Sequence, residues 1–178
     1  MKTEDFKILI SEQEIQEKIA EMADKLNDLY GQEPVYAVCV LKGAVLFAVD
    51  LVRKLKMPVR MEFIRLSSYG SGTTTSGKVN AVDISLPDLN DKNVIIIEDI
   101  VDTGLTAKFL LDFLKINFRT KSTVFCSLLD KKMTRKTDVK PDFYCFDIDD
   151  KFVAGYGLDY DGYFRNLPYI GYIENLDL

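Results

Sequence analysis

Apolar residues at helical spacing mark the first element of the chain. Five of them recur at alternating intervals of four and three positions: Ile15, Ile19, Met22, Leu26 and Leu29. This period is typical of one buried face of an α-helix. Ser11 and Glu14 precede the pattern in the order of a capping box, and Gly31 and Pro34 follow it as stop signals. We therefore expect a helix that starts after Ser11 and ends at Gly31.

Mostly apolar runs of strand length come next. They occupy residues 35–41, 94–97, 122–129 and 143–148. Runs that are apolar at nearly all positions predict strands that are buried on both faces, which is typical of a parallel sheet covered by helices. Two segments of more mixed polarity, 59–66 and 81–86, are predicted to pair with this sheet as further strands.

Helical stretches lie between the strands. One occupies residues 44–55, and the apolar face of another consists of Leu105, Phe109, Leu110, Phe113 and Leu114. Strands that alternate with helices predict an α/β fold, with a doubly wound, mostly parallel sheet flanked by helices and joined by right-handed crossovers. Beyond Asp150 the chain becomes aromatic and rich in glycine. We expect short strands near the two chain termini to form a small hood beside the sheet.

Composition and charge narrow the choice of function. A length of 178 residues suits one domain, and a net charge of −5 argues against nucleic acid or an anionic membrane as a partner. The absence of histidine excludes imidazole catalysis and His-ligated zinc. Cys39, Cys126 and Cys145 each lie in an apolar run, which suits buried thiols in a reducing compartment. No apolar stretch approaches the ~18 residues of a membrane span, so we expect a cytoplasmic protein.

The candidate chemistry lies in residues 94–106. Glu98, Asp99 and Asp102 follow the buried strand, and Thr-Gly-Leu-Thr at 103–106 opens the next helix. Open α/β sheets bind ligands at the carboxyl ends of their strands. The N–H groups, hydroxyls and helix dipole of such a turn suit a phosphate monoester, and the carboxylates suit ribose hydroxyls and Mg²⁺. Alternatively, the acids are solvated loop residues or caps of the helix.

This stretch resembles a known family. Residues 98–106 look like the phosphoribosyl-pyrophosphate signature of type I phosphoribosyltransferases, and nearly the whole chain is similar to the hypoxanthine-guanine phosphoribosyltransferases. Four further blocks match, at 41–43, 67–70, 129–131 and 152–165. The resemblance implies a single phosphoribosyltransferase domain over residues 1–178. Some members of the family have Lys where this chain has Leu105, so phosphate binding would depend on backbone and hydroxyl donors.

The resemblance implies a role for each matching residue. The ribose and its 5′-phosphate would be bound by Glu98, Asp99, Asp102, Thr103, Gly104, Leu105 and Thr106. Pyrophosphate would be bound by Lys42, Gly43 and Arg165, and the purine base by Lys131, Phe152, Val153 and Asp159. Glu98, Asp99 and Asp159 would hold Mg²⁺, and Ser68 and Tyr69 would close over the site. The peptide before Lys42 is usually cis in this family.

The implied function is purine salvage with Mg²⁺ as the cofactor. The enzyme would transfer phosphoribosyl from its pyrophosphate donor to hypoxanthine, guanine or both, giving IMP or GMP and pyrophosphate, and it would be a homodimer or homotetramer. Lys131 offers only hydrogen-bond donors, which suits a 6-oxo group and disfavours adenine. Asp102 is the candidate general acid/base for the purine N7 proton, since the chain has no histidine.

Two other functions stay open. A related regulator would bind nucleic acid and use the same site as a sensor, although the only basic stretch is 131–140. A phosphoacceptor signalling domain also places acids and a lysine at strand ends, but it explains neither the loop 67–78 nor the aromatic C-terminal part. We expect that loop, rich in Gly, Ser and Thr, to be disordered without the donor and to become ordered when the donor binds.

Overall fold

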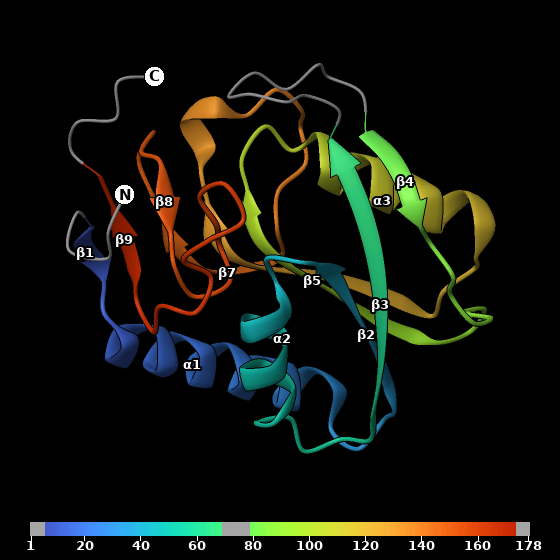
Figure 1. The fold of residues 1–178 in the computed structure, drawn as a ribbon. Coiled ribbons are helices and arrows are strands. Elements are labelled where there is room, and N and C mark those ends of the chain that lie inside the picture. Colours follow the sequence, from blue (N-terminus) through green and yellow to red (C-terminus); the bar gives the residue numbers. More distant parts are fainter. Residues whose placement is uncertain (1–5, 69–78, 174–178) are drawn as a thin grey trace.

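The described strands form two sheets, one central and one at its side (Figure 1). The computed structural model describes the backbone of residues 6–68 and 79–173 and the side chains of 6–66 and 84–173. The strands are β1 (Lys7–Ile10), β2 (Val35–Leu41), β3 (Val59–Ser68), β4 (Val79–Asp83), β5 (Asn93–Val101), β6 (Ser122–Asp130), β7 (Phe143–Asp147), β8 (Val153–Ala154) and β9 (Ile170–Tyr172). The helices are α1 (Glu12–Tyr30), α2 (Val45–Val52), α3 (Leu105–Asn117) and a short 3-10 helix, η2 (Lys132–Thr134).

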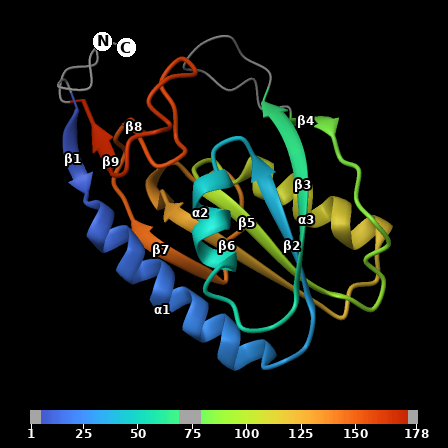
Figure 2. The ribbon, with the colours of Figure 1, turned by 60° about the horizontal axis from the view of Figure 1, so that its bottom comes forward.

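The central sheet confirms the predicted α/β architecture. Its strands lie in the order β4-β3-β2-β5-β6-β7, and all neighbours pair in parallel except β4, which pairs antiparallel with β3 at the edge. Alternate side chains divide the core between the two faces. Ala37 and Cys39 pack with α1 and α2, whereas Val38 and Val40 pack with α3 on the opposite side (Figure 2). The sheet is therefore covered by helices on both faces.

The first helix has the predicted ends but a slightly different buried face. Ser11 caps it, with both hydrogen bonds of the capping box present. The expectation that Leu29 belongs to the buried stripe is wrong, because Leu29 is 55% exposed while Tyr30 is buried. Successive residues of a helix are rotated by ~100° about its axis. With this rotation, Ala23 and Tyr30 lie at one edge of the buried face, and Leu29 lies just outside the opposite edge.

Three other elements end or begin at residues that differ from the predicted ones. The strand predicted at 94–97 continues to Val101, because β6 runs beside it and pairs with it as far as Asp130. The helix predicted at 44–55 ends at Val52 and gives way to turns. The strand predicted at 81–86 lies at Val79–Asp83 instead, since its register follows the long partner β3. The ends of the two strands are decided by pairing with neighbouring strands, which the polarity pattern of one segment does not reveal.

The smaller sheet is the predicted hood. It joins β1 from the start of the chain to β9 and β8 from its end, in the order β1-β9-β8. Phe6, Ala154 and Leu167 form a small core beneath it. Between β8 and β9 the chain makes tight turns in which Gly155, Tyr156 and Gly157 have positive φ. These turns bring the hood against the carboxyl end of β2.

The burial of the cysteines follows from their places in the central sheet. Cys39 and Cys126 are buried and Cys145 is only partly buried, since β7 is an edge strand. Burial raises the pKa of the Cys39 thiol to about 12, so this thiol is inert. Of the helices in the described parts of the chain, none combines the length and the apolarity that crossing a membrane requires.

Candidate active site

The predicted site residues gather at the carboxyl ends of three neighbouring parallel strands. β2 ends at Leu41, β5 at Val101 and β6 at Asp130, and these strands lie side by side in the sheet. The amide N–H of Lys131 donates to the carbonyl oxygen of Val101 at 3.0 Å, which fixes the chain after β6 to the chain after β5. Lys42, Asp102 and Lys131 thus follow three strand ends at one edge, where open α/β sheets bind their ligands.

The turn after β5 has the form expected of a phosphate-binding turn. Gly104 is the N-cap of α3 and has φ +78, a conformation that glycine adopts without steric cost. The amide of Leu105 donates to the hydroxyl of Thr103 at 3.4 Å, and no side chain caps the helix. The first N–H groups of α3 are thus directed at the turn, where an anion is favoured by the helix dipole.

Asp102 does not cap the helix, contrary to one of the alternatives raised by the sequence. Its Oδ1 accepts a hydrogen bond from the hydroxyl of Thr134 in η2, and its backbone oxygen accepts from Arg135 Nε at 2.9 Å. The side chain is only partly buried. One face of the carboxylate is therefore oriented by the protein while the residue as a whole stays accessible to a ligand.

Glu98 and Asp99 lie within the last part of β5 in different surroundings. Glu98 is 5% exposed, and its Oε2 has no hydrogen-bond partner among the described residues. Burial, together with the neighbouring Asp99 carboxylate, raises the pKa of Glu98 to about 8. Burial also raises the pKa of Asp99 to about 6, against the opposing effect of hydrogen bonds from the Asp99 and Ile100 amides. Both acids are thus held where a cation would favour their charged forms.

Gly43 is the point of closest approach in the site. A Cβ at this position would lie 1.6 Å from Oδ2 of Asp99, and a Cβ on Gly157 would lie 2.0 Å from the carbonyl oxygen of Gly43. Asp99, Gly43 and Gly157 therefore stack directly on one another, with no room for a side chain between them. The peptide between Leu41 and Lys42 is cis, as in the family that the sequence resembles, and Lys42 is exposed beside it.

Asp159 and Arg165 of the hood bind each other. Their side chains form an ion pair at 2.5 Å, and Asp159 also accepts from the amide of Gly162 at 2.8 Å. Arg165 Nη1 donates to the carbonyl oxygen of Gly157 at 2.6 Å. Arg165 lowers and Asp159 raises the pKa of Asp99, although burial has the larger effect. The pair thus stands close enough to the end of β5 for its charges to act on Asp99.

The residues assigned to the purine lie between β6 and the hood. Lys131 is 8% exposed and forms an ion pair with Asp150 at 2.6 Å. Phe152 meets Tyr160 edge to face, with ring centroids 5.4 Å apart, and is only partly buried. Val153 is buried in β8. A partly exposed ring, a lysine with its ammonium tied to an exposed acid, and backbone groups of β8 are suited to a flat heterocycle that carries an oxygen.

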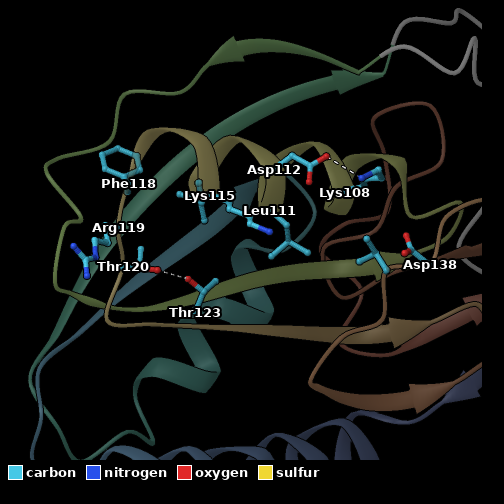
Figure 3. Close-up of a pocket in the computed structure, with 11 residues that line it drawn as sticks. Lys108, Leu111, Asp112, Lys115, Phe118, Arg119, Thr120, Thr123 and Asp138 are labelled. Atoms are coloured by element: carbon cyan, nitrogen blue, oxygen red, sulfur yellow. Dashed lines mark hydrogen bonds and ion pairs between the residues drawn. The ribbon is translucent and has the colours of Figure 1, made fainter.

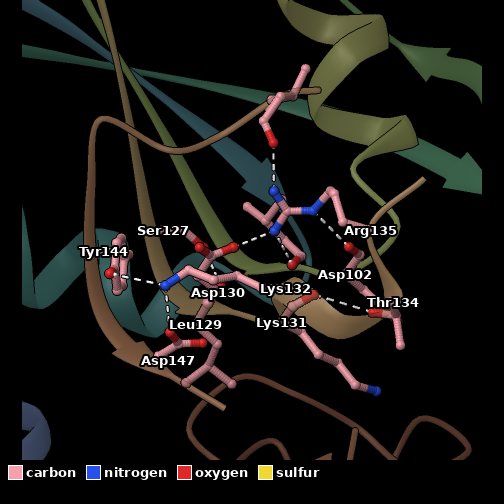
Figure 4. A network of polar contacts seen from close by, with 12 residues as sticks. Asp102, Ser127, Leu129, Asp130, Lys131, Lys132, Thr134, Arg135, Tyr144 and Asp147 are labelled. Carbon is pink, nitrogen blue, oxygen red and sulfur yellow. Dashed lines mark hydrogen bonds and ion pairs between the residues drawn. The ribbon is translucent and has the colours of Figure 1, made fainter. Parts of the chain in front are cut away.

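Arg135 is a residue beside the candidate site to which the sequence analysis assigned no role. Its guanidinium pairs with Asp130, which is 2% exposed, and donates to the backbone oxygens of Val101, Asp102 and Val139 (Figure 4). The side chain of Lys131 points away from this cluster in the same view. The available signal was Asp130 at the end of an apolar strand, because a buried carboxylate requires a cation.

A separate cavity of about 670 Å³ lies beside α3 (Figure 3). It is lined by α3, by the segment after it and by Asp138 and Val139. None of the predicted site residues lines it.

Two predicted site residues lie at the limit of the described part of the chain. Ser68 ends β3, but its side chain lies outside the described residues, and so does the segment from Tyr69 to residue 78. The geometry therefore concentrates the candidate chemistry at the sheet edge and the hood.

Comparison with known proteins agrees with this arrangement. Residues 8–161 match the model of the phosphoribosyl transferase domain. The hypoxanthine-guanine phosphoribosyltransferase of Bacillus subtilis (strain 168) is 41% identical over 174 residues, which cover 98% of this chain and 96% of that protein. A solved hypoxanthine phosphoribosyltransferase structure from Staphylococcus aureus is 35% identical with a TM-score of 0.90, covering 96% of this chain and 93% of that one.

A second solved structure extends the likeness. It is a hypoxanthine-guanine phosphoribosyltransferase from Bacillus anthracis with a HEPES molecule in its active site. It is 41% identical to this chain, with a TM-score of 0.87, and the match covers 94% of this chain and 98% of that one. The likeness in fold thus extends over nearly the whole of both chains.

Proposed function

We propose, from the premise that this chain belongs to the hypoxanthine-guanine phosphoribosyltransferase family, that it is a purine salvage enzyme. It transfers the phosphoribosyl group of 5-phosphoribosyl 1-pyrophosphate to hypoxanthine, guanine or both, and it releases pyrophosphate. The observation that carries this proposal is the meeting of a phosphate-binding turn, the adjacent carboxylates of Glu98 and Asp99, and the groups assigned to the base at one sheet edge. A single phosphoribosyltransferase domain over residues 1–178 is part of this proposal, and the family model matches residues 8–161 of it.

The chain's own groups can be assigned to the steps of this reaction. N–H groups and hydroxyls of residues 103–106 bind the 5′-phosphate. Lys42 and Arg165 neutralise the charge that develops on pyrophosphate as its bond to ribose C1 breaks. Asp102, oriented by Thr134, accepts or returns the N7 proton of the base while N9 attacks the sugar. Leu105 supplies no charge, so the turn relies on neutral donors.

The purine is recognised by groups between β6 and the hood. The Lys131 ammonium donates to the 6-oxo group, which requires it to exchange Asp150 for the ligand. Phe152 stacks on the ring, and the backbone of Val153 meets its edge. Because an ammonium has donors only, a 6-amino group would face another donor there. This arrangement favours hypoxanthine and guanine over adenine.

Mg²⁺ fits the acids of the site as a partner shared with the substrate. Among the described side chains, those of residues 6–66 and 84–173, no three of the metal-binding types come together as a complete site. Glu98 nevertheless has a buried oxygen without a partner, and Asp99 lies beside it, so carboxylate oxygens are available. Mg²⁺ commonly takes one or two carboxylates and completes its shell with water and phosphate oxygens. Glu98, Asp99 and Asp159 would hold it, and it would supply positive charge to the ribose hydroxyls and the leaving pyrophosphate.

The competing regulatory function is disfavoured by the pairing of the basic stretch 131–140. Lys131 pairs with Asp150, Lys132 with Asp147 and Arg135 with Asp130. Cations that are neutralised in this way offer little attraction to a phosphate backbone. The free thiols are consistent with a cytoplasmic enzyme, because disulfides are rare in reducing compartments.

A homodimer or homotetramer is also part of this proposal. Leu46 and Val49 of α2 and Phe63 of β3 are 37%, 39% and 45% exposed. Phe63 pairs with Cys39 in the parallel register, so it lies on the face that α2 covers. An apolar surface shared by two elements suits a second copy of the chain. Val49→Glu should shift the mass measured by light scattering toward the monomer, and an unchanged mass would place the interface elsewhere.

The function is tested by rates with hypoxanthine, guanine and adenine, and by alanine variants of two neighbouring lysines. Hypoxanthine or guanine should turn over with the donor and Mg²⁺, while adenine turnover within about tenfold of hypoxanthine would refute the assignment. Lys131→Ala should lose rate with 6-oxopurines. Lys132→Ala is the matched control, because Lys132 is the next residue but is exposed and paired with Asp147. Equal kinetics of the two variants would show that Lys131 does not contact the base.

A further inference from the structure

The hood is tied to the body of the protein through one buried tyrosine. Tyr156 is 5% exposed, and its hydroxyl donates to Oδ2 of Asp50 in α2 at 2.6 Å. Gln16 of α1 donates to the same oxygen at 2.7 Å. Three segments that are far apart in the sequence therefore meet at one carboxylate oxygen.

The backbone of Tyr156 shows that this contact constrains the chain. Its φ is +48, between Gly155 at +104 and Gly157 at +98. A bulky residue seldom adopts this region, and it does so where the surroundings determine its conformation. Two successive amides are also fixed. The amide of Tyr156 donates to the carbonyl oxygen of Leu167 at 2.8 Å, and the amide of Gly157 donates to the carbonyl oxygen of Arg165 at 2.9 Å. Tyr156 is thus held by its backbone and by its hydroxyl.

The contact between Tyr156 and Asp50 closes a ring of contacts that includes Gly43 of the candidate site. Asp50 lies on α2, which begins two residues after Gly43. Gly157 directly follows Tyr156, and a Cβ on it would lie 2.0 Å from the carbonyl oxygen of Gly43. The two ends of the ring therefore meet at the peptide of Gly43, and the hydroxyl contact to Asp50 closes its other side. Any rotation of the hood about one contact is opposed by the other.

We propose that Tyr156 is a positioning residue whose hydrogen bond to Asp50 sets the distance between the hood and the Lys42–Gly43 segment. Arg165 is on the hood and donates to the carbonyl oxygen of Gly157, so its guanidinium moves with this distance. Lys42 is on the other side of the Gly43 contact. In the proposed function, Arg165 and Lys42 both bind the pyrophosphate of one phosphoribosyl donor molecule, so this inference rests on that function. Loss of the hydroxyl should weaken use of the phosphoribosyl donor before it weakens folding.

Tyr156→Phe is the first test, because it keeps the ring and removes only the hydroxyl. Tyr30→Phe is the matched control. Tyr30 is a buried residue of α1 (7% exposed), and its hydroxyl makes a hydrogen bond of 3.3 Å with Ser122 Oγ and not with any residue of the hood. Loss of a hydrogen bond to a charged group changes an equilibrium constant by about tenfold or more. We expect Tyr156→Phe to raise KM for the donor about tenfold with little change in KM for the base, and Tyr30→Phe to leave both constants unchanged.

A double-mutant cycle with Asp50→Ala separates the hydrogen bond from packing. If the bond carries the effect, the double variant should be no worse than the more impaired single variant. Independent, multiplying losses would overturn the inference, as would a donor KM in Tyr156→Phe within twofold of the wild type. Equal losses for both substrates would also overturn it, because they would indicate a general structural defect.

Hydrogen exchange gives a readout that does not depend on activity. Tyr156→Phe should speed exchange of the amides of residues 155–167 at least tenfold and leave β5 unchanged, while Tyr30→Phe should leave 155–167 as in the wild type. If the wild type does not use the donor at all, the proposed function fails, and exchange alone then decides whether Tyr156 fixes the hood. Unchanged exchange in 155–167 would refute that role in either case.

Discussion

Replacement of Gly157 by alanine tests the close contact between the hood and the Gly43 segment. The added Cβ would start 2.0 Å from the carbonyl oxygen of Gly43, whereas real Cβ atoms essentially never come closer than 3.0 Å to another heavy atom. The obstacle is backbone, so no side-chain rotation can relieve it. The hood and the Gly43 segment must separate by about 1 Å, and a misplacement of that size can cost about 10²-fold in rate.

Gly162→Ala is the matched control for this change. Gly162 is also in the hood and has φ +82, close to the +98 of Gly157, but a Cβ there would meet nothing within 4 Å. Alanine in this left-handed region costs roughly 1–2 kcal/mol at either position. The difference between the two variants therefore isolates the contact with Gly43 from the conformational preference of glycine.

The assay is kcat/KM with the phosphoribosyl donor and a 6-oxopurine, together with the free energy of unfolding in urea. We expect Gly162→Ala to lose stability of the stated size while it keeps its kinetic constants. Gly157→Ala should lose more stability and about 10²-fold in kcat/KM, which is roughly 2.7 kcal/mol in the transition state. If the two variants matched in both stability and kcat/KM, the stacking of Gly157 on Gly43 would not control the site.

Three further predictions concern single contacts. Because the pKa of Glu98 is raised from 4.5 to about 8, the folded metal-free protein should lose stability as pH rises from about 4.5 to 8, and Glu98→Gln should flatten this fall in urea unfolding with a chelator present. Ser11→Ala, which removes the α1 cap, should lower the unfolding free energy by about 1 kcal/mol, and a loss below 0.3 kcal/mol would contradict the capping box. Arg135→Leu should cost about 3–5 kcal/mol by leaving Asp130 buried and unpaired, and addition of Asp130→Leu should restore much of that loss; a further loss would refute the pairing.

The elements of this protein were largely readable from local pattern. β2 lies at the predicted 35–41, and α1 begins at the predicted cap, because apolar runs and capping side chains act over a few neighbouring residues. The carboxylates and the turn after β5 could be picked out for the same reason. A strand end followed by acids and a Gly-containing turn is a local chemical arrangement, and the parallel fold brings such ends together.

Other features depend on partners that are remote in the chain. β5 continues through Glu98 and Asp99 because β6 pairs with it. Leu29 is exposed because the buried stripe of α1 extends toward Ala23 and Tyr30 and ends before Leu29. Neither outcome follows from the polarity of the segment itself. Both depend on which surface the element meets once the sheet has formed.

The relation between the sheet and the hood was decided by tertiary structure alone. Sequence reasoning assigned Tyr156 no role in the site and counted Arg135 only within the basic stretch 131–140. In the structure, Tyr156 binds Asp50, and Arg135 binds Asp130 and the backbone oxygens of Val101 and Asp102. A buried charge or hydroxyl must find a partner, but the identity of that partner depends on which segments the fold brings within hydrogen-bond distance. The sequence by itself determined the types of the elements and the chemistry at the strand ends. The spacing between those groups arises from contacts such as that of Gly157 with Gly43, which exist only when the hood has packed against the folded sheet.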